Sequence, residues 1–285
     1  MASTTESRRR PRSQNTWGNP VVYLAALMLI GLMLGPVLYI IIGGFRTNSQ
    51  ITADPAGLPD PWELGNYTGV LSSSTFWNQV LNSTIVAGAT TIGVVGLGVM
   101  ASYVLARYRV RGRGAMYALV AAGLMFPATV AITPLYILVK NLGIVNTLPG
   151  VILPQIAFGL PTTIIILVPF LQAIPKEIEE AAAIDRCSRL GFFWRMVLPL
   201  SVPGLITTGI LAFIGSWNSY LLPLFILNDQ DSFTLPLGVQ AFASQYSVDT
   251  AKVLAFTSLS MIPALVFFSV FERRIVGGLT GAVKG

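Results

Sequence analysis

Long runs of apolar residues, separated by shorter polar segments, dominate the pattern of this chain. Each run reaches or nearly reaches the roughly 20 residues that an α-helix needs to cross the hydrocarbon core of a bilayer. The runs cover residues 17–45, 80–106, 115–139, 148–172, 200–228 and 253–271. The pattern therefore predicts an all-α, polytopic membrane protein with six transmembrane helices.

The polar segments divide the chain further. Residues 1–16 are polar and basic, which predicts a disordered tail ahead of a transmembrane domain that covers residues 17–285. The first apolar run is far longer than the core of a signal peptide and lacks a convincing cleavage site. We therefore expect it to remain as a transmembrane helix. Residues 46–77 contain several prolines and predict a turn-rich connection.

The segment 174–199 is polar and charged, although it lies between two long apolar runs. Pro175 suits the first position of a short helix, because its missing N–H costs nothing there, and Glu177 then lies in the positive first turn. One face of this helix is expected to hold Ile174, Ile178, Ala181 and Ala182. The segment thus offers a narrow surface of small residues.

Ser188 is expected to cap a second short helix within the same segment. A bulky apolar stripe along that helix comprises Leu190, Phe193, Trp194, Val197 and Leu198. Two interpretations fit an amphipathic helix pair beside transmembrane runs. The pair could rest among lipid headgroups, or a partner protein could hold it.

Lysine and arginine residues gather on alternate polar segments, which fixes an orientation under the positive-inside rule. Fifteen of them lie on one side: Arg8, Arg9, Arg10, Arg12, Arg107, Arg109, Arg111, Arg113, Lys176, Arg186, Arg189, Arg195, Arg273, Arg274 and Lys284. The other side holds only Arg46, Lys140 and Lys252. We therefore expect a cell-membrane protein with both termini and the segment 174–199 in the cytoplasm.

The composition excludes several classes of function. Hydrophobic residues make up 53% of the chain and charged residues 11%, far below the roughly 25% charged residues of soluble domains. The net charge of +6 belongs to loops beside the apolar runs, so we expect no nucleic-acid partner. The chain has no histidine and one cysteine, and it lacks nucleotide-binding glycine motifs. We expect no catalytic residue, no metal site and no cofactor bound by this chain.

No apolar run contains an Asp, Glu, Lys or Arg. Ion-driven carriers usually place such a group in the membrane as a relay or ligand. Any transport by this chain is therefore expected to draw energy from a cytoplasmic partner, with the segment 174–199 as the docking point. A stand-alone facilitator, an ion-coupled sugar carrier and a structural membrane subunit remain as alternatives.

The segment 174–199 resembles the cytoplasmic coupling loop of ABC importer permeases. That loop has the pattern E-A-A, three residues, G, nine residues, I, one residue, L-P. In the same register this chain has Glu180-Ala181-Ala182, then Arg186, Met196 and Leu198-Pro199. Glycine at the fourth of these positions would permit a positive φ between the two helices. With Arg186 there, we expect a tighter helical turn whose guanidinium points to solvent or to a phosphate.

Other stretches are similar to carbohydrate-importer permeases, and the C-terminal end resembles the maltose-type subfamily. These stretches are residues 82–87, 101–108, 134–136, 142–147, 153–154, 217–224 and 278–285. The resemblance implies a type I ABC importer permease fold with a cytoplasmic coupling helix. It also implies a second homologous permease, two ABC ATPase subunits that bind ATP and Mg, an extracytoplasmic solute-binding protein and a sugar or polyol substrate.

The resemblance further implies two contacts with the ATPase subunits. The coupling loop would contribute Glu179, Glu180, Ala181, Ala182, Asp185, Arg186, Leu190 and Phe193. A C-terminal tail at residues 276–285 would contribute Leu279, Thr280, Gly281 and Lys284. A frayed terminus is the alternative interpretation of that tail.

Polar and aromatic residues inside the apolar runs are candidates for the substrate path. They are Asn82, Gln155, Trp217, Asn218 and Tyr220. Aromatic faces suit the apolar faces of sugar rings, and a buried amide needs a polar partner. Contacts between helices explain the same residues equally well. The sequence does not specify which sugar or polyol is carried.

Overall fold

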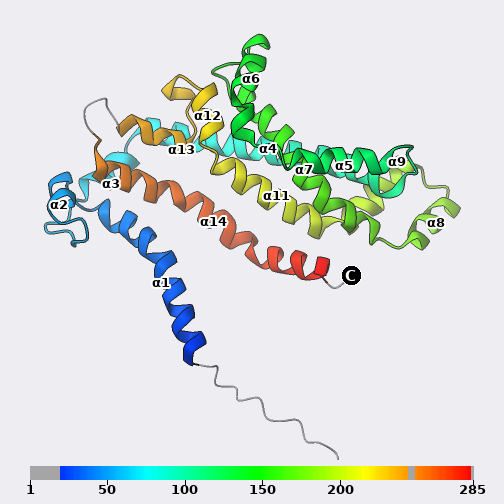
Figure 1. Cartoon of the computed structure of the whole chain (residues 1–285), viewed down its shortest axis with the longest axis horizontal. Helices are drawn as coiled ribbons and strands as arrows, with labels where there is room; N and C mark the ends of the chain where they lie inside the picture. The colour runs from blue at the N-terminus through cyan, green and yellow to red at the C-terminus, as the bar shows by residue number, and fades with distance from the viewer. Residues whose placement is uncertain (1–19, 243–247, 284–285) are drawn as a thin grey trace, which may run out of the picture.

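The computed structural model describes residues 20–242 and 248–283, with side chains up to residue 270 (Figure 1). The expected tail at residues 1–16 lies outside this range. Within the described residues every regular element is a helix, as the all-α prediction requires. Four long helices are α1 (Pro20–Gly43), α4 (Ser74–Arg107), α7 (Leu148–Gln172) and α14 (Thr250–Val283).

The remaining elements are short helices between these four. They are α2 (Asn48–Ala53), α3 (Gly65–Leu71), α5 (Arg113–Gly123), α6 (Ala128–Asn141), α8 (Lys176–Ile184), α9 (Arg189–Phe192), η1 (Phe193–Val197), α10 (Leu198–Leu200), α11 (Val202–Trp217), α12 (Leu221–Ile226), η2 (Gln230–Ser232), α13 (Leu235–Gly238) and η3 (Val239–Phe242). Of these, η1 is a π-helix, and η2 and η3 are 3-10 helices.

The third predicted span is not one straight helix. It consists of α5 and α6, whose axes are bent by 97° around the break at residues 124–127. Pro127 occupies the N-cap of α6 in an extended conformation, and its ring cannot donate the hydrogen bond that would continue α5. Figure 1 shows α6 directed away from the long axis that α5 follows. A hydropathy pattern registers the apolar length and misses this bend.

The fifth predicted span is interrupted as well. The helix α11 ends at Trp217, and the chain turns through residues 218–220 before α12 begins at Leu221. A second bend of 74° separates Arg189–Leu200 from α11. Among residues 20–242 and 248–283, four helices are long and apolar enough to cross a membrane, and the number rises to as many as six when each bent pair counts as one span.

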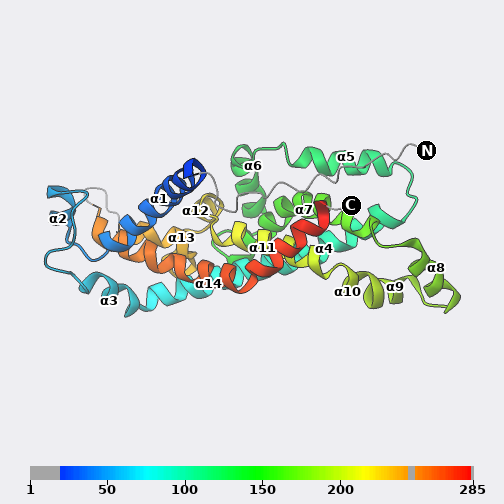
Figure 2. The same ribbon diagram turned by 90° about the horizontal axis from the view of Figure 1, so that it is seen from below.

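The centre of the molecule is a packed trio of helices. The helix α4 lies along α7 and α11, and α14 covers α11 from the other side (Figures 1 and 2). At 34 residues α4 is about 51 Å long, which exceeds the thickness of the hydrocarbon core. Small residues allow the close approach, since Gly93 and Gly98 on α4 face Ile156 and Thr163 on α7.

The two ends of the trio carry different structures. In both views α2 and α3 lie at one end of the long axis, and α8 and α9 lie at the opposite end (Figures 1 and 2). The helix α1 leaves the bundle at the α2 end and extends away from it. Its apolar side chains are exposed along almost its whole length, and its contacts are mainly with α14.

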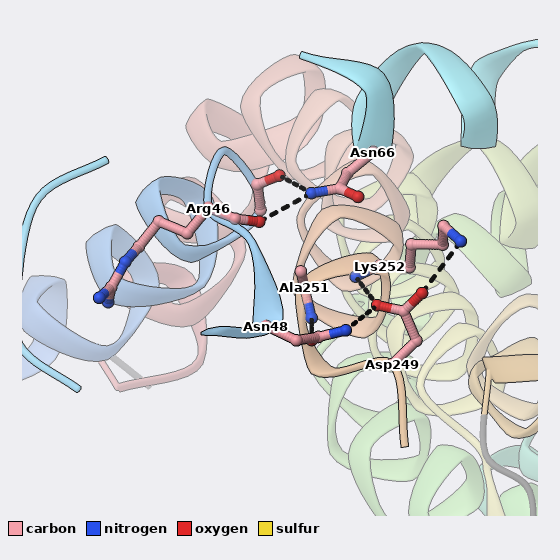
Figure 3. Close-up of polar contacts among 7 residues, drawn as sticks. Arg46, Asn48, Asn66, Asp249, Ala251 and Lys252 are labelled. Atoms are coloured by element: carbon pink, nitrogen blue, oxygen red, sulfur yellow. Dashed lines mark hydrogen bonds and ion pairs between the residues drawn. The ribbon is translucent and has the colours of Figure 1, made fainter. Parts of the chain in front are cut away.

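A polar network fastens the connection after α1 to the start of α14 (Figure 3). The side-chain amide of Asn48 donates to Asp249 Oδ1 at 2.9 Å, while its oxygen accepts from the Ala251 N–H at 2.9 Å. Lys252 Nζ lies 3.0 Å from Asp249 Oδ2. Asn66 Nδ2 donates to the carbonyl oxygens of Gly44 and Arg46. These bonds hold the α2 end as one unit.

The Arg46 side chain organises the same connection from inside. Arg46 is 2% exposed, and its guanidinium donates to the carbonyl oxygens of Gln50, Asp54 and Pro55. Three backbone acceptors compensate for burial of the charge. In the sequence, Arg46 is only one of the few basic residues on the sparsely charged side. In the structure it holds the connection after α1 together through backbone carbonyls.

Candidate functional site

The helix α8 presents a mixed surface at its end of the molecule. It begins at Lys176, one residue later than predicted. Pro175 is therefore its N-cap and not its first helical residue. Ile174 and Ala182 are buried, and Ile178 is partly buried against them. Ala181, expected on the same face, is exposed instead. The helix therefore packs on the bundle through positions four residues apart and leaves Ala181 outward.

The outward face of α8 includes most of the predicted docking residues. Glu180, Ala181, Asp185 and Arg186 are exposed, and Glu179 is partly exposed. Ala182 packs inside the chain's own core, so it acts from behind this surface. Ile184 is 82% exposed, which is unusual for a large aliphatic side chain next to a helix end.

The turn after α8 shows how arginine is accommodated at a position where the family pattern has glycine. Arg186 adopts a positive φ of 55°, the left-handed conformation that glycine accepts most readily. Its N–H donates to the Ala183 carbonyl, and the Cys187 N–H donates to the Ala182 carbonyl. This pair of bonds is the Schellman motif, which ends helices with a left-handed residue. The prediction of a tighter helical turn is therefore wrong, because the backbone keeps the left-handed turn of a glycine, whereas the side chain of Arg186 is exposed as expected.

The second predicted helix begins where the sequence indicated. Ser188 is the N-cap of α9, and its Oγ accepts from the Gly191 N–H at 3.1 Å. The chain then widens into the π-helix η1 at residues 193–197. The wider turn splits the expected apolar stripe. Phe193 and Val197 are buried, whereas Leu190 and Trp194 are 68% and 60% exposed.

Arg107, at the end of α4, anchors the beginning of the segment 174–199. Its Nη2 donates to the Ile174 carbonyl at 2.5 Å, and its Nη1 lies 3.7 Å from Glu179 Oε2. The Arg107 side chain is 5% exposed and that of Glu179 is 45% exposed. In the sequence, Arg107 indicates only the orientation in the membrane. A basic residue ending a long apolar run carries no local signal that it contacts a segment 67 residues later.

An aromatic layer supports the same junction. The Tyr103 ring lies 5.1 Å from that of Phe193 and 5.5 Å from that of Tyr108. The Arg189 guanidinium lies 5.4 Å from the Tyr108 ring centroid. Together with Arg107, these contacts join the end of α4 to both short helices of the segment 174–199. A displacement of that segment would therefore also displace the end of α4.

A cavity of about 260 Å³, lined mainly by apolar groups together with a few polar side chains, lies among α4, α7 and α11. Gln155 of α7 lines it, and its Oε1 accepts from Ser216 Oγ at 2.5 Å and from Thr90 Oγ1 at 3.2 Å. Gln155 Nε2 is buried and has no hydrogen-bond partner among the described residues. The cavity thus contains an unused amide donor in the middle of the helix trio.

The other predicted path residues do not share this cavity. Asn82 Nδ2 donates to the carbonyl oxygens of Asp231 and Phe233, at 2.7 and 3.0 Å. Trp217 and Asn218 line a separate cavity of about 450 Å³, in which Trp217 is buried beside Phe213. Tyr220 is 41% exposed, and its hydroxyl accepts from Gln240 Nε2 at 3.0 Å. The five residues are therefore spread over several places.

The predicted C-terminal contact can be located only in part. The backbone of residues 279–281 continues the helix α14, whose described part ends at Val283. The side chains of Leu279, Thr280 and Gly281 lie beyond the part described at side-chain level, and Lys284 lies outside the described residues altogether.

Comparison with known proteins gives a consistent result. Residues 94–276 match the family model of the binding-protein-dependent transport system inner membrane component. The diacetylchitobiose uptake system permease protein NgcG of Streptomyces coelicolor is 36% identical over 87% of this chain and 83% of its own length. The trehalose transport system permease protein SugB of Mycobacterium tuberculosis is 35% identical over 90% and 95%, respectively.

The fold is also similar to that of a solved transporter. A chain in the crystal structure of a bacterial ABC transporter involved in the import of the acidic polysaccharide alginate superimposes with a TM-score of 0.75. The alignment covers 93% of this chain and 99% of that one, at 21% identity. At this identity the match establishes the architecture.

Proposed function

Because the chain belongs to the family of binding-protein-dependent transport system inner membrane components, we propose that it forms half of the translocation pathway of an ATP-driven carbohydrate importer. As a member of this family it is a non-catalytic membrane permease, which acts with ATPase subunits and a solute-binding protein. The proposed substrate is a carbohydrate or related polyol, because relatives at 35–36% identity transport diacetylchitobiose and trehalose.

The observation that carries the proposal is the exposed surface of α8, α9 and η1. Ile184, Leu190 and Trp194 project large apolar side chains at the end of the molecule that also carries Glu180 and Asp185. An apolar patch with a charged rim is typical of a protein interface. The proposed occupant is a cleft on an ABC ATPase, with Glu180 meeting a basic residue there. Two such subunits would serve two permeases.

The proposed orientation places α8 in the cytoplasm and α2 outside. Basic residues surround the α8 end, which includes Arg107, Arg111 and Arg189, in accord with the positive-inside rule. Both termini would then be cytoplasmic. The network around Asn48 and Asp249 would face the extracytoplasmic solute-binding protein. Residues 276–285 would extend α14 toward the ATPases.

A second permease subunit is the proposed neighbour of α1. None of the 18 residues in the most apolar window of α1 is buried, so the helix meets little of its own chain. Lipid can cover part of such a helix, but a lone transmembrane helix gains more from packing when a second bundle lies beside it. The complete pathway would therefore lie between this chain and a homologous permease.

Reversal of charge at Glu180 tests the proposed docking. The variant Glu180→Lys, in the assembled importer, should retain its membrane level but lose ATP-dependent uptake of labelled sugar. Arg111→Glu is the matched control. It reverses an exposed charge at the α8 end of the molecule but outside the segment 174–199. Normal uptake by Glu180→Lys, or sugar transport by the purified chain alone in liposomes, would contradict the proposal.

A further inference from the structure

A second buried amide lies in a cavity at the α2 end of the molecule. The cavity has a volume of about 340 Å³, and its walls come from α3, α4, η2, α13, η3 and α14. Gln79 of α4 lines this cavity and is 1% exposed. Neither Nε2 nor Oε1 of Gln79 has a hydrogen-bond partner among the described residues.

Burial of an unpaired amide is costly. Each polar atom that loses water without gaining a partner destabilises the fold. Leucine or methionine would fill the same volume without that cost. Moreover, a Cβ at Gly238 would lie 2.0 Å from Gln79 Oε1, so only glycine leaves the amide its present place. The position of the Gln79 amide therefore depends on two residues from separate elements.

The cavity has an apolar wall around this amide. The Phe76 and Phe256 rings lie edge to face with centroids 5.6 Å apart, and the Phe242 and Phe256 centroids are 5.3 Å apart. Phe76 and Phe256 are buried, whereas Gln230 and Lys252 are exposed lining residues. The cavity thus has a buried aromatic and amide floor and a polar rim.

The charges around the cavity are balanced. Lys252 is the cation of its lining, and Lys252 Nζ is paired with Asp249 at 3.0 Å. No carboxylate lines the cavity within the described residues. A neutral ligand is therefore favoured over an ion. An amide that donates and accepts suits a hydroxyl pair or an acetamido group, and phenyl faces suit the C–H face of a sugar ring.

We propose that this cavity binds one neutral sugar ring through Gln79, at the face of the permease opposite the coupling helix α8. The volume lies within the usual range for small-molecule sites. The choice of a sugar as ligand, and the outward position of the site, rest on the proposed function. The site would hold sugar at the outer face, apart from the cavity around Gln155.

Neighbouring serines allow a site-specific test. Ser73 lines the cavity, whereas Ser72 is exposed beside it and does not. In the assembled importer with Cys187→Ser, Ser73→Cys and Ser72→Cys would each be labelled with a membrane-impermeant maleimide. N-acetylglucosamine, used as the probe, should slow labelling at position 73 and leave position 72 unchanged. Glycine betaine at equal osmolality controls for solvent effects.

Two changes to the amide then locate the binding. Gln79→Leu and, separately, Gly238→Ala should raise the sugar concentration for half-protection about tenfold, since roughly two hydrogen bonds are lost. Ser102→Ala is the control, because Ser102 is another buried, unpaired polar residue of α4 that lines none of the three cavities described. It should leave protection unchanged.

The outcomes separate this site from the importer proposal. Three results would each overturn the sugar site. They are absence of protection at position 73 when N-acetylglucosamine is present at 100-fold the maleimide concentration, equal protection at position 72, and full protection in Gln79→Leu. The labelling needs neither ATP nor a binding protein, so it stands whatever drives uptake. Labelling of Ser72→Cys only in inverted vesicles would instead contradict the proposed orientation.

Discussion

The Arg107 guanidinium donates a hydrogen bond of 2.5 Å to the Ile174 carbonyl, which joins the end of α4 to the residue before the N-cap of α8. The same side chain lies 3.7 Å from Glu179 Oε2. This buried cation thus links α4 to α8, alongside the contact between the Tyr103 and Phe193 rings. Force applied to α8 by an ATPase would pass through this contact into the helix trio.

Replacement of Arg107 by methionine should uncouple transport from ATP hydrolysis. The change keeps an unbranched, largely apolar stem but removes the guanidinium, so the Ile174 carbonyl loses its donor and Glu179 loses its basic neighbour. We expect at least a fivefold fall in sugar molecules moved per ATP hydrolysed by reconstituted complex, with less effect on ATPase binding. Arg109→Met is the control, since Arg109 is exposed two residues later. An unchanged transport-to-ATP ratio in Arg107→Met would mean that the contact is merely structural.

Glycine at position 186 should stabilise the turn after α8. A left-handed residue other than glycine costs about 1–2 kcal/mol, and Arg186→Gly removes that cost. Hydrogen exchange followed by mass spectrometry should show about fivefold slower exchange at the amides of residues 186 and 187. Arg186→Ala removes the same charge but retains a Cβ, so it should give no such slowing. Equal protection in both variants would assign the effect to charge.

Some parts of this architecture could be predicted from the sequence because the signal is local. The span 148–172 has the predicted ends in the structure, since Thr147 accepts from the Gly150 N–H and the apolar run stops at Gln172. Ser188 is a comparable case. In both, a capping residue adjoins a uniform pattern, so the helix boundary is determined within a few residues.

Other parts depend on contacts that no local pattern records. The bend at Pro127 interrupts a run that is apolar throughout, so the hydropathy pattern does not indicate it. Gln155 was a candidate by its polarity alone, yet its cavity depends on Thr90 and Ser216 from two other helices. Gln79 was missed because one amide near the start of an apolar run is common at an interface. Its lack of partners appears only after folding.

Acidification should loosen the network between Asn48 and Asp249. Burial of the Asp249 carboxyl raises its pKa, but hydrogen bonds from Lys252 and Asn48 lower it, and the resulting pKa lies below its ordinary value. A folded-state pKa below the unfolded one adds stability above the unfolded pKa, which is lost as the pH falls through the folded pKa. The network should therefore be intact at neutral pH and weakened below about pH 4.

The variant Asp249→Asn checks this pH dependence. It should lower the thermal midpoint of the purified complex at pH 7, while its difference from the wild type should shrink at about pH 3.5. Asp231→Asn provides a control, because Asp231 is an exposed carboxylate at the same end. A constant difference between Asp249→Asn and wild type at both pH values would show that the charge of Asp249 contributes nothing.

Asn82 offers a way to separate structural from transport roles among the candidate path residues. Both amide hydrogens are engaged by backbone carbonyls of residues 231 and 233, which fixes η2 to α4. Asn82→Ala should therefore lower stability by about 1–3 kcal/mol and leave the relative uptake of different sugars unchanged. Thr84→Val is the comparison, since the Thr84 hydroxyl donates to the Val80 carbonyl of its own helix and to no other group in the described part of the chain. A changed sugar preference in Asn82→Ala would place its side chain on the substrate path.

Gln155 should behave in the opposite way in transport, because its Nε2 is unused and the cavity beside it has room for a ligand. Gln155→Met preserves volume and removes the unpaired donor, but it also removes the acceptor of the Ser216 and Thr90 hydroxyls, so we expect a modest loss of stability. If the substrate passes this amide, the maximal rate of uptake should fall severalfold while the sugar concentration for half-maximal uptake stays set by the binding protein. Thr163→Val, on the same wall of the cavity, distinguishes loss of the amide from loss of any polar group. Wild-type uptake by Gln155→Met would leave the Gln155 bonds to Ser216 and Thr90 as a purely structural link between helices.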